Sequence, residues 1–217
     1  MIRRRIIILI SLSALCLPRY AQAQLVSRFE KDDSGAGQFA LRLARRALDA
    51  YCLRRERLTS PADVPSLLRS RGGVFVSAMD KGGAPRCCMG SLYPRSSALA
   101  AQIIDTATMA AAHDQRFKPL RPGELAGLRV IVSILDPPEP IFDPYSLDPV
   151  TDGLAARGVT RTGVVLPGET SRLDRFVGWA RLRAAATPSG PVTYLKLKAI
   201  RFVEPAPAPV HVKGDHS

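Results

Sequence analysis

The sequence is poor in histidine and in the short motifs that mark common enzymes. It has three histidines in 217 residues, and His211 and His216 lie close to the C-terminus. Zinc sites use about four His, Cys or carboxylate ligands, so we expect no metal site. The sequence has no Gly-x-Ser-x-Gly motif and no glycine-rich phosphate-binding loop. We therefore expect neither a nucleophile elbow nor a bound cofactor.

Aromatic residues are also scarce, at 6% of the chain, and no basic stripe is interleaved with them. Nucleic-acid-binding surfaces combine such stripes with aromatic side chains, so we expect no specific nucleic acid partner. Hydrophobic residues make up 46% of the chain, which is enough for a core filled mainly by Ala, Val and Leu. The length fits one domain or two small interlocked ones.

The N-terminus has the three parts of a signal peptide. Arg3-Arg4-Arg5 is followed by an apolar run over residues 6–17 and then by Ala21-Gln22-Ala23. The pattern predicts cleavage after Ala23 and a periplasmic or secreted protein. The alternative is a retained anchor, but the run is shorter than the ~20 apolar residues of a spanning helix. After cleavage we expect no transmembrane segment.

The formal charge is +12, and removal of the four arginines within residues 1–23 lowers it to +8. A basic exported protein meets anionic lipid head groups or cell-wall polymers, so an anionic surface is one possible partner. The other interpretation is a solvated basic surface that keeps the protein soluble.

Helical periodicity marks three segments. Apolar residues recur at i, i+3, i+4 and i+7 spacing and predict a helix over residues 38–58. An alanine-rich helix is predicted over 98–112, and Ser171-x-x-Asp174 resembles a capping box that opens a third helix. The polar stretch 24–37 is predicted to be a linker, and alternating Pro and Ala predict a stiff tail over 205–217.

Strands are predicted over 73–79 and 86–92, joined by the turn Asp80-Lys81-Gly82-Gly83. Further strands are expected over 128–135, 154–157, 163–166 and 194–203. The prolines of residues 136–140 predict irregular structure there. Strands and helices mix without strict βαβ alternation, so the predicted fold class is α+β with antiparallel pairing.

A set of short matches gives the chain a family resemblance. Gly73-Val74-Phe75-Val76 matches the opening of a hairpin, and Arg86, Cys88 and Gly90 match a strand that reads Leu-Arg-Gly-Cys-Ile-Gly. Asp114-Gln115-Arg116-Phe117 resembles Asp-Pro-Arg-Phe downstream. Residues 38–204 thus resemble the AMMECR1 domain family. The resemblance implies two interlocked layers of antiparallel sheet and helix, and no settled biochemical activity.

Three differences separate this sequence from the family strand: Pro85, Cys87 and Met89 stand where it has Leu, Gly and Ile. A Lys-Ala-Gly-Leu element near the family's C-terminus is not recognisable around residues 182–186.

Alternation along a strand places Arg86, Cys88 and Gly90 on one face, and this predicts a ligand cleft. Arg86 would lower the pKa of the Cys88 thiol or bind an anionic ligand, and Gly90 would allow close approach. Asp114 and Arg116 are either further ligand contacts or a loop-ordering ion pair. The structural alternative is that Cys88 is a small buried side chain and Arg86 part of an ion pair.

Cleavage of the signal peptide leaves three cysteines, Cys52, Cys87 and Cys88, in an oxidising compartment. Adjacent strand residues point to opposite faces, so Cys87 and Cys88 are poorly placed for a shared metal ion or a mutual bond. A Cys52–Cys87 disulfide is one prediction, and three reduced, buried thiols are the other.

Two functions therefore stay open. The first is a binding or interaction module for an unknown small molecule or protein, using the cleft, the basic first helix and the Lys196/Lys198 strand face. The second is an enzyme that acts on a small anionic or modified substrate, with Arg86 and Cys88 in its site.

Overall fold

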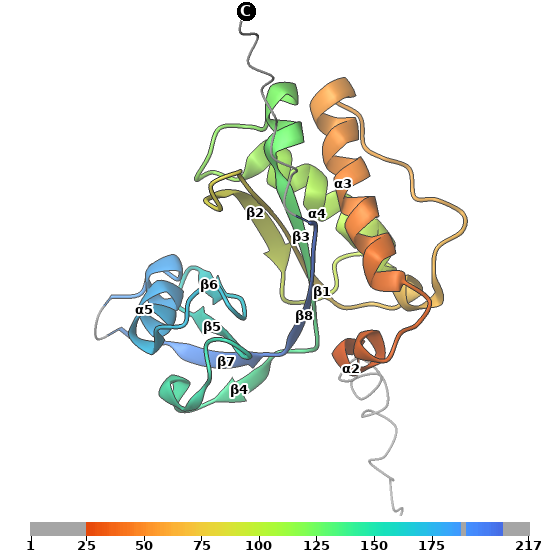
Figure 1. Cartoon of the computed structure of the whole chain (residues 1–217). Coiled ribbons are helices and arrows are strands. Elements are labelled where there is room, and N and C mark those ends of the chain that lie inside the picture. The colour runs from red at the N-terminus through yellow and green to blue at the C-terminus, as the bar shows by residue number, and fades with distance from the viewer. Residues whose placement is uncertain (1–24, 188–189, 206–217) are drawn as a thin grey trace, which may run out of the picture.

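The computed structural model describes residues 25–187 and 190–205 and contains two four-stranded antiparallel sheets (Figure 1). The strands are β1 (Gly73–Met79), β2 (Pro85–Ser91), β3 (Arg129–Leu135), β4 (Glu139–Ile141), β5 (Gly153–Arg157), β6 (Thr162–Val165), β7 (Thr193–Leu197) and β8 (Ala199–Val203). The helices are α2 (Leu25–Glu30), α3 (Ala36–Arg54), α4 (Leu99–His113) and α5 (Leu173–Arg183), with 3-10 turns η2 (Ser66–Arg69), η3 (Pro122–Gly127) and η4 (Pro144–Ser146). The predicted α+β fold class is confirmed.

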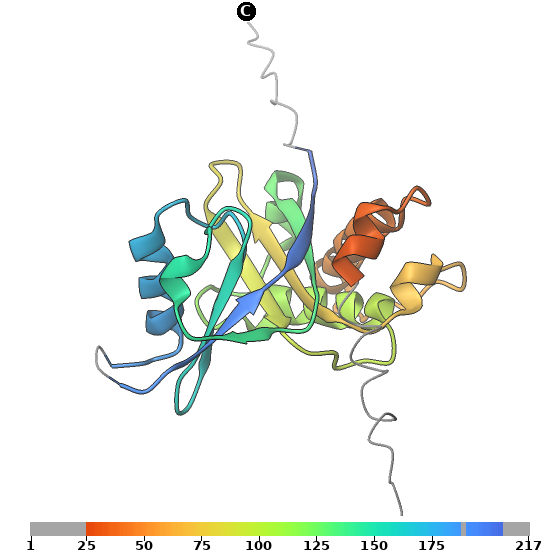
Figure 2. The same cartoon turned by 90° about the horizontal axis from the view of Figure 1, so that it is seen from below.

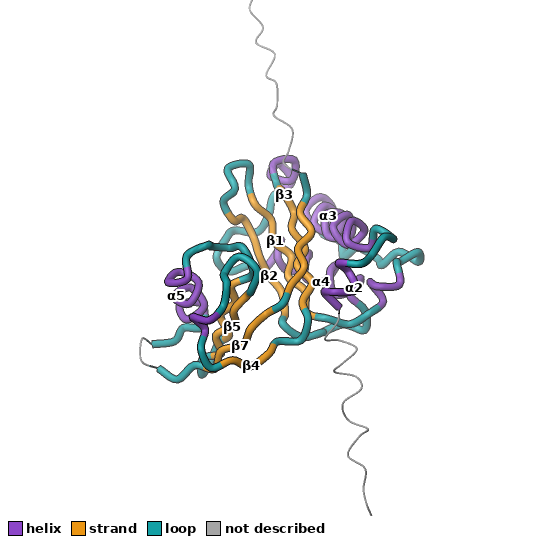
Figure 3. Tube along the Cα trace, turned by 60° about the horizontal axis from the view of Figure 1, so that its bottom comes forward, coloured by secondary structure: helices purple, strands orange, loops and turns teal. Residues whose placement is uncertain are grey.

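The first sheet has the order β2-β1-β3-β8 and packs one face against α3 and α4. Period-2 alternation points Val74, Val76 and Ala78 of β1 into this core, where each is fully buried. The alanines of α4 leave room for the helix to lie close to the sheet. The second sheet, β4-β7-β5-β6, carries α5 on its outer face. Figure 3 shows the resulting layers, with strands between α3 and α4 on one side and α5 on the other.

The two sheets are joined by strands that run through both of them. The expected strand over 194–203 is instead two strands, β7 in the second sheet and β8 in the first (Figure 2). The irregular segment expected over 136–140 ends within β4, which continues β3 into the second sheet. The Asp136 N–H donates to the Lys198 carbonyl at 3.1 Å and bridges the two bends. Pro140 is accommodated because β4 is an edge strand.

The predicted linker over 24–37 is wrong, because that segment holds α2 and the start of α3. Leu25, Val26 and Phe29 are buried, since α2 packs its apolar face on β3 and β8. The Asp136 carboxylate accepts from the Val26 N–H at 3.0 Å at the start of α2. A short amphipathic helix thus follows the predicted cleavage point. The predicted signal peptide of residues 1–23 and the tail beyond residue 205 lie outside the described residues.

Two further comparisons with the sequence concern α3 and membrane crossing. Helix α3 ends at Arg54, earlier than residue 58, because Arg55 takes a left-handed conformation with φ 58°. Within the described residues, no helix is both long and apolar enough to cross a lipid bilayer.

The hairpin turn between β1 and β2 lies where the sequence places it. The Gly83 N–H donates to the Asp80 carbonyl at 3.0 Å, and Gly83 alone of the turn glycines has a positive φ, 81°. We expect Gly83→Val to cost about 1–2 kcal/mol through backbone strain. Thermal unfolding should show a melting temperature lower by about 2–4 °C per kcal/mol. Gly82→Ala is the control, and an equal loss there would contradict this assignment of the strained position.

Candidate functional site

The backbone of Cys88 is held by two side chains from the loop after α4. The Cys88 N–H donates to Asp114 Oδ2 at 2.7 Å, and Arg116 Nη2 donates to the Cys88 carbonyl at 3.0 Å. Arg116 also pairs with Asp114 through Nε–Oδ1 (3.0 Å) and Nη2–Oδ2 (2.8 Å). We call this arrangement the Asp114–Arg116 clasp. Because β2 is an edge strand, the clasp supplies the hydrogen bonds that a neighbouring strand would give at Cys88.

Asp114 is 9% exposed, so its charge depends on these partners. Burial raises the pKa of Asp114, but the bonds from Arg116 and the Cys88 N–H outweigh it, and the net pKa lies below 3.8. Asp114 is therefore ionised at neutral pH. Asp114 and Arg116 form the ion pair that the sequence analysis gave as one of the two alternatives.

The alternation predicted that Arg86 shares one face with Cys88 and Gly90. The structure shows that it does not. A β-bulge lies opposite Ala78 and Met79, which pair with Cys87 and Pro85, so Arg86 is the extra residue. Its guanidinium turns to Glu124 of η3, with Nε–Oε1 at 2.5 Å and Nη2–Oε2 at 3.1 Å. The bonds from Arg86 lower the pKa of Glu124. Arg86 is thus used in a bidentate ion pair that docks η3 onto the hairpin.

Gly90 permits a close approach, but the group that approaches is Phe75. A Cβ built on Gly90 would lie 2.3 Å from Phe75 Cγ and 2.4 Å from the Val74 carbonyl oxygen. Phe75 is the cross-strand partner of Gly90, and its ring covers the position that a side chain would take. The glycine is therefore required by packing within the hairpin.

The three cysteines of the described residues are free, so the predicted Cys52–Cys87 disulfide is not formed in this structure. Cys52 and Cys87 belong to the same core of the first sheet, and both are buried. Burial raises the pKa of the Cys87 thiol to about 12 and raises the pKa of Cys52 and of Cys88 as well. Burial thus disfavours the thiolate form of all three cysteines.

We expect Cys52 and Cys87 to resist alkylation by iodoacetamide in the folded protein and to react after unfolding in guanidinium. The reason is that attack needs the thiolate, which burial disfavours. Peptide mapping by mass spectrometry without reduction gives the result. A Cys52 peptide joined to a Cys87 peptide would contradict it.

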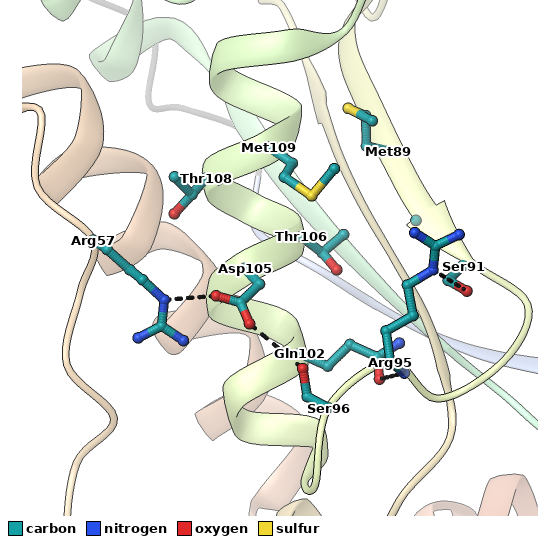
Figure 4. A pocket seen from close by; sticks show the side chains of 11 residues that line it. Arg57, Met89, Ser91, Arg95, Ser96, Gln102, Asp105, Thr106, Thr108 and Met109 are labelled. Atoms are coloured by element: carbon teal, nitrogen blue, oxygen red, sulfur yellow. Dashed lines mark hydrogen bonds and ion pairs between the residues drawn. The ribbon is translucent and has the colours of Figure 1, made fainter.

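A groove of about 370 Å³ lies between β2 and α4. On β2 it begins at Met89, the residue after Cys88, which the clasp holds. Figure 4 shows Met89 and Met109 at one end, and Ser91, Arg95 and Thr106 nearer the other. Its remaining lining residues are Arg57, Gly90, Ser96, Gln102, Asp105 and Thr108. Of the five residues predicted for the site, only Gly90 lines the groove. Arg86, Cys88, Asp114 and Arg116 lie outside this lining.

The sequence analysis also predicted binding by the Lys196/Lys198 strand face and by the basic first helix, and part of this positive charge is neutralised by ion pairs. Lys196 pairs with Asp152 at 2.9 Å, and Lys198 lies at the bend between β7 and β8, so the two do not form a strand face. On α3, Arg42 and Arg46 are exposed beside Phe39. No cluster of His, Cys, Asp and Glu suited to a metal ion occurs in residues 25–187 and 190–205.

Comparison with known proteins decides the family. A family model described as AMMECR1 matches residues 41–203. The chain belongs to the AMMECR1 family. The crystal structure of the uncharacterized protein PH0010 from Pyrococcus horikoshii resembles this AMMECR1 domain with a TM-score of 0.70. The two are 29% identical, and the match covers 79% of this chain and 93% of that one.

Sequence relatives of the AMMECR1 domain are similarly without a named activity. A protein of Thermofilum pendens is 32% identical in an alignment of 203 residues, which covers 82% of this chain and 92% of that protein. A protein of Thermotoga maritima is 41% identical over 101 residues, and the match spans 58% of its length. Membership of the family confirms the predicted fold. The names of these relatives state no biochemical activity.

Sequence reasoning missed the groove because its walls come from two separate elements. The signal available was the i, i+4 spacing of Gln102 and Thr106 with Met109 on α4, whose polar members interrupt a run of alanine and isoleucine. That interruption marks a helix side that is not wholly packed into the core. It does not reveal which strand lies opposite.

Proposed function

We propose that this AMMECR1 domain is a binding module that takes its ligand in the groove between β2 and α4. The observation that carries the proposal is that the groove is open, while the groups expected to do chemistry are engaged elsewhere. Arg86 is paired with Glu124, and Asp114 and Arg116 hold the backbone of Cys88. A concave site with apolar walls and a few polar groups is the usual form of a ligand site.

The alternative is an enzyme for a small anionic or modified substrate with Arg86 and Cys88 in its site. It has less support, because neither Cys88 nor Arg86 lines the groove and Arg86 is paired with Glu124. Burial also raises the pKa of Cys88, which opposes nucleophilic use.

Methionine methyl groups give a direct test of the groove. The chain has four methionines, of which Met89 and Met109 line the groove and Met79 ends β1 away from it. With ¹³C-methyl methionine labelling, a library of small organic fragments should move the Met89 and Met109 resonances and leave Met79 unchanged. Met109→Trp should abolish the shift at Met89 by filling the groove, whereas Leu53→Trp, on the exposed side of α3, should not.

Absence of any fragment that moves Met89 or Met109 would overturn the proposal. Equal shifts at Met79 and at the groove methionines would do the same, because they would indicate non-specific binding.

We also propose that the protein is exported by cleavage after Ala23. Support comes from the charged, apolar and small-residue segments of the N-terminus. Mass spectrometry of the periplasmic or secreted fraction should find Gln24 as the first residue. Recovery of the chain with Met1 in the cytosol would contradict export.

An anionic surface is proposed as a partner of the exposed side of α3. Arg42 and Arg46 lie one and two turns after Phe39 on α3, with the Arg42 guanidinium 5.9 Å from the ring centroid. Binding to vesicles of anionic lipid should fall in the double variant Arg42→Gln/Arg46→Gln and with rising salt. Binding that is unchanged by either would contradict this surface.

A further inference from the structure

The outward-facing backbone groups at the edge of β2 are hydrogen-bonded at Cys88 but available at Gly90. Cys88 turns its N–H and carbonyl away from β1 and toward the clasp. In an antiparallel pair these groups alternate in direction, so Gly90, two residues on, also turns its N–H and carbonyl away from β1. Gly90 is exposed and lines the groove. Within the described part of the chain, neither group has a side-chain partner like the one at Cys88.

The rest of the groove offers contacts on either side of this open peptide. Met89 and Met109 lie at one end and form an adaptable apolar wall (Figure 4). Thr106 is 7% exposed, lines the groove, and its hydroxyl has no partner among the described residues. The Arg95 guanidinium bonds to Ser91 Oγ at 3.2 Å and has no carboxylate partner in residues 25–187 and 190–205.

This combination selects the chemistry of the ligand. A free phosphate or carboxylate at Gly90 would satisfy the N–H but would face the carbonyl oxygen beside it with a like partial charge. A peptide group satisfies both, because it offers a donor and an acceptor at strand spacing. Arg95 and Thr106 are then available to bind an acidic group next to the paired residue. The two methionines are available to contact an apolar side chain.

We propose that the groove binds a short extended peptide segment that carries a carboxylate and pairs with the edge of β2 at Gly90. The proposal rests on the proposed binding function and names its ligand class. The clasp prevents pairing at Cys88, so the added strand is short, with Gly90 as its anchoring residue. Affinity then depends on side-chain contacts at the methionines and at Arg95.

The test begins with selection of short random peptides displayed on phage against the full chain. Peptides that bind the full chain but not the groove-filling variant Met109→Trp should be enriched in Asp or Glu near an apolar residue. A selected peptide, labelled with fluorescein, is then measured by fluorescence polarisation. N-methylation of its backbone should abolish binding at the position that faces the Gly90 carbonyl and have little effect at its neighbours, because neighbours in a strand point the other way.

Arg95→Gln should weaken the selected peptide about five- to tenfold, as expected for loss of one charge-assisted hydrogen bond. Arg175→Gln makes the same change of charge on α5 and should leave the affinity unchanged. If no peptide is selected, the proposal is overturned. Uniform tolerance of N-methylation would overturn it as well, because the peptide would then bind through side chains alone.

The outcomes separate the two proposals. If fragments move the groove methionines but no acidic peptide binds there, the binding function stands and the peptide ligand is wrong. If neither binds, both fail.

Discussion

Gly90→Ala will destabilise the protein by about 2–4 kcal/mol, the upper range for overpacking a filled site. The new Cβ would meet the Phe75 ring at 2.3 Å and the Val74 carbonyl at 2.4 Å, and backbone cannot give way as a flexible side chain does. Chemical denaturation followed by circular dichroism measures the change. We expect a lower midpoint and an unchanged m-value.

Gly178→Ala is the matched control for this substitution. Gly178 lies in α5 with nothing within 4 Å of its Cβ position, so alanine there should raise stability by up to about 1 kcal/mol. Gly90→Ala with a stability equal to that of the unmodified chain would show that Phe75 can move aside, and would reopen Gly90 as a position kept small for a ligand.

Asp114→Asn is the second large effect, with an expected loss of about 2–3 kcal/mol. The amide cannot balance the Arg116 charge, and it places a donor or a weaker acceptor against the Cys88 N–H. Asp174→Asn is the control, because Asp174 forms an ion pair with Arg172 at the same spacing but on the exposed surface, and we expect little change. Similar losses in both would contradict a special role of burial at Asp114.

The same pair predicts a pH dependence. The folded-state pKa of Asp114 lies below its unfolded value of 3.8, so its stabilisation is complete above that value. It is lost as the pH falls through the folded-state pKa, when the carboxylate takes up a proton. The unmodified protein should therefore lose stability more steeply below about pH 4 than Asp114→Asn does. Parallel acid-denaturation curves would contradict this.

Local sequence patterns correctly predicted those elements in which a single periodicity, that of a strand or that of a helix, runs through the whole element. Strand β1 and helix α4 lie within one residue of their expected bounds, because Val74, Val76 and Ala78 alternate and the apolar residues of α4 repeat with helical spacing. Where the physical cause was not local, the prediction failed. The bend at Lys198 is set by the switch of pairing partner from β5 to β3, and a strand pattern alone carries no information on its partner.

The expectation that Arg86 lies on one face with Cys88 and Gly90 failed for a related reason. Alternation placed Arg86 beside Cys88, but the bulge at Arg86 reversed its direction. The residues that carry the family resemblance, Asp114 and Arg116 among them, are mutual partners in folding the hairpin. Motif residues near one another in space can therefore mark a structural junction.

The passage of β3–β4 and β7–β8 through both sheets also affects how the chain folds. Ile131 must find Val203, and Glu139 must find Lys196, before either sheet is complete. Pairing between residues so far apart in the sequence makes loop closure costly and folding slow. Neither of the two sheets with its helices can therefore reach its native form without the other. A protease nick near Lys198 should therefore release both halves together, and hydrogen exchange should report one opening event for strands of both sheets.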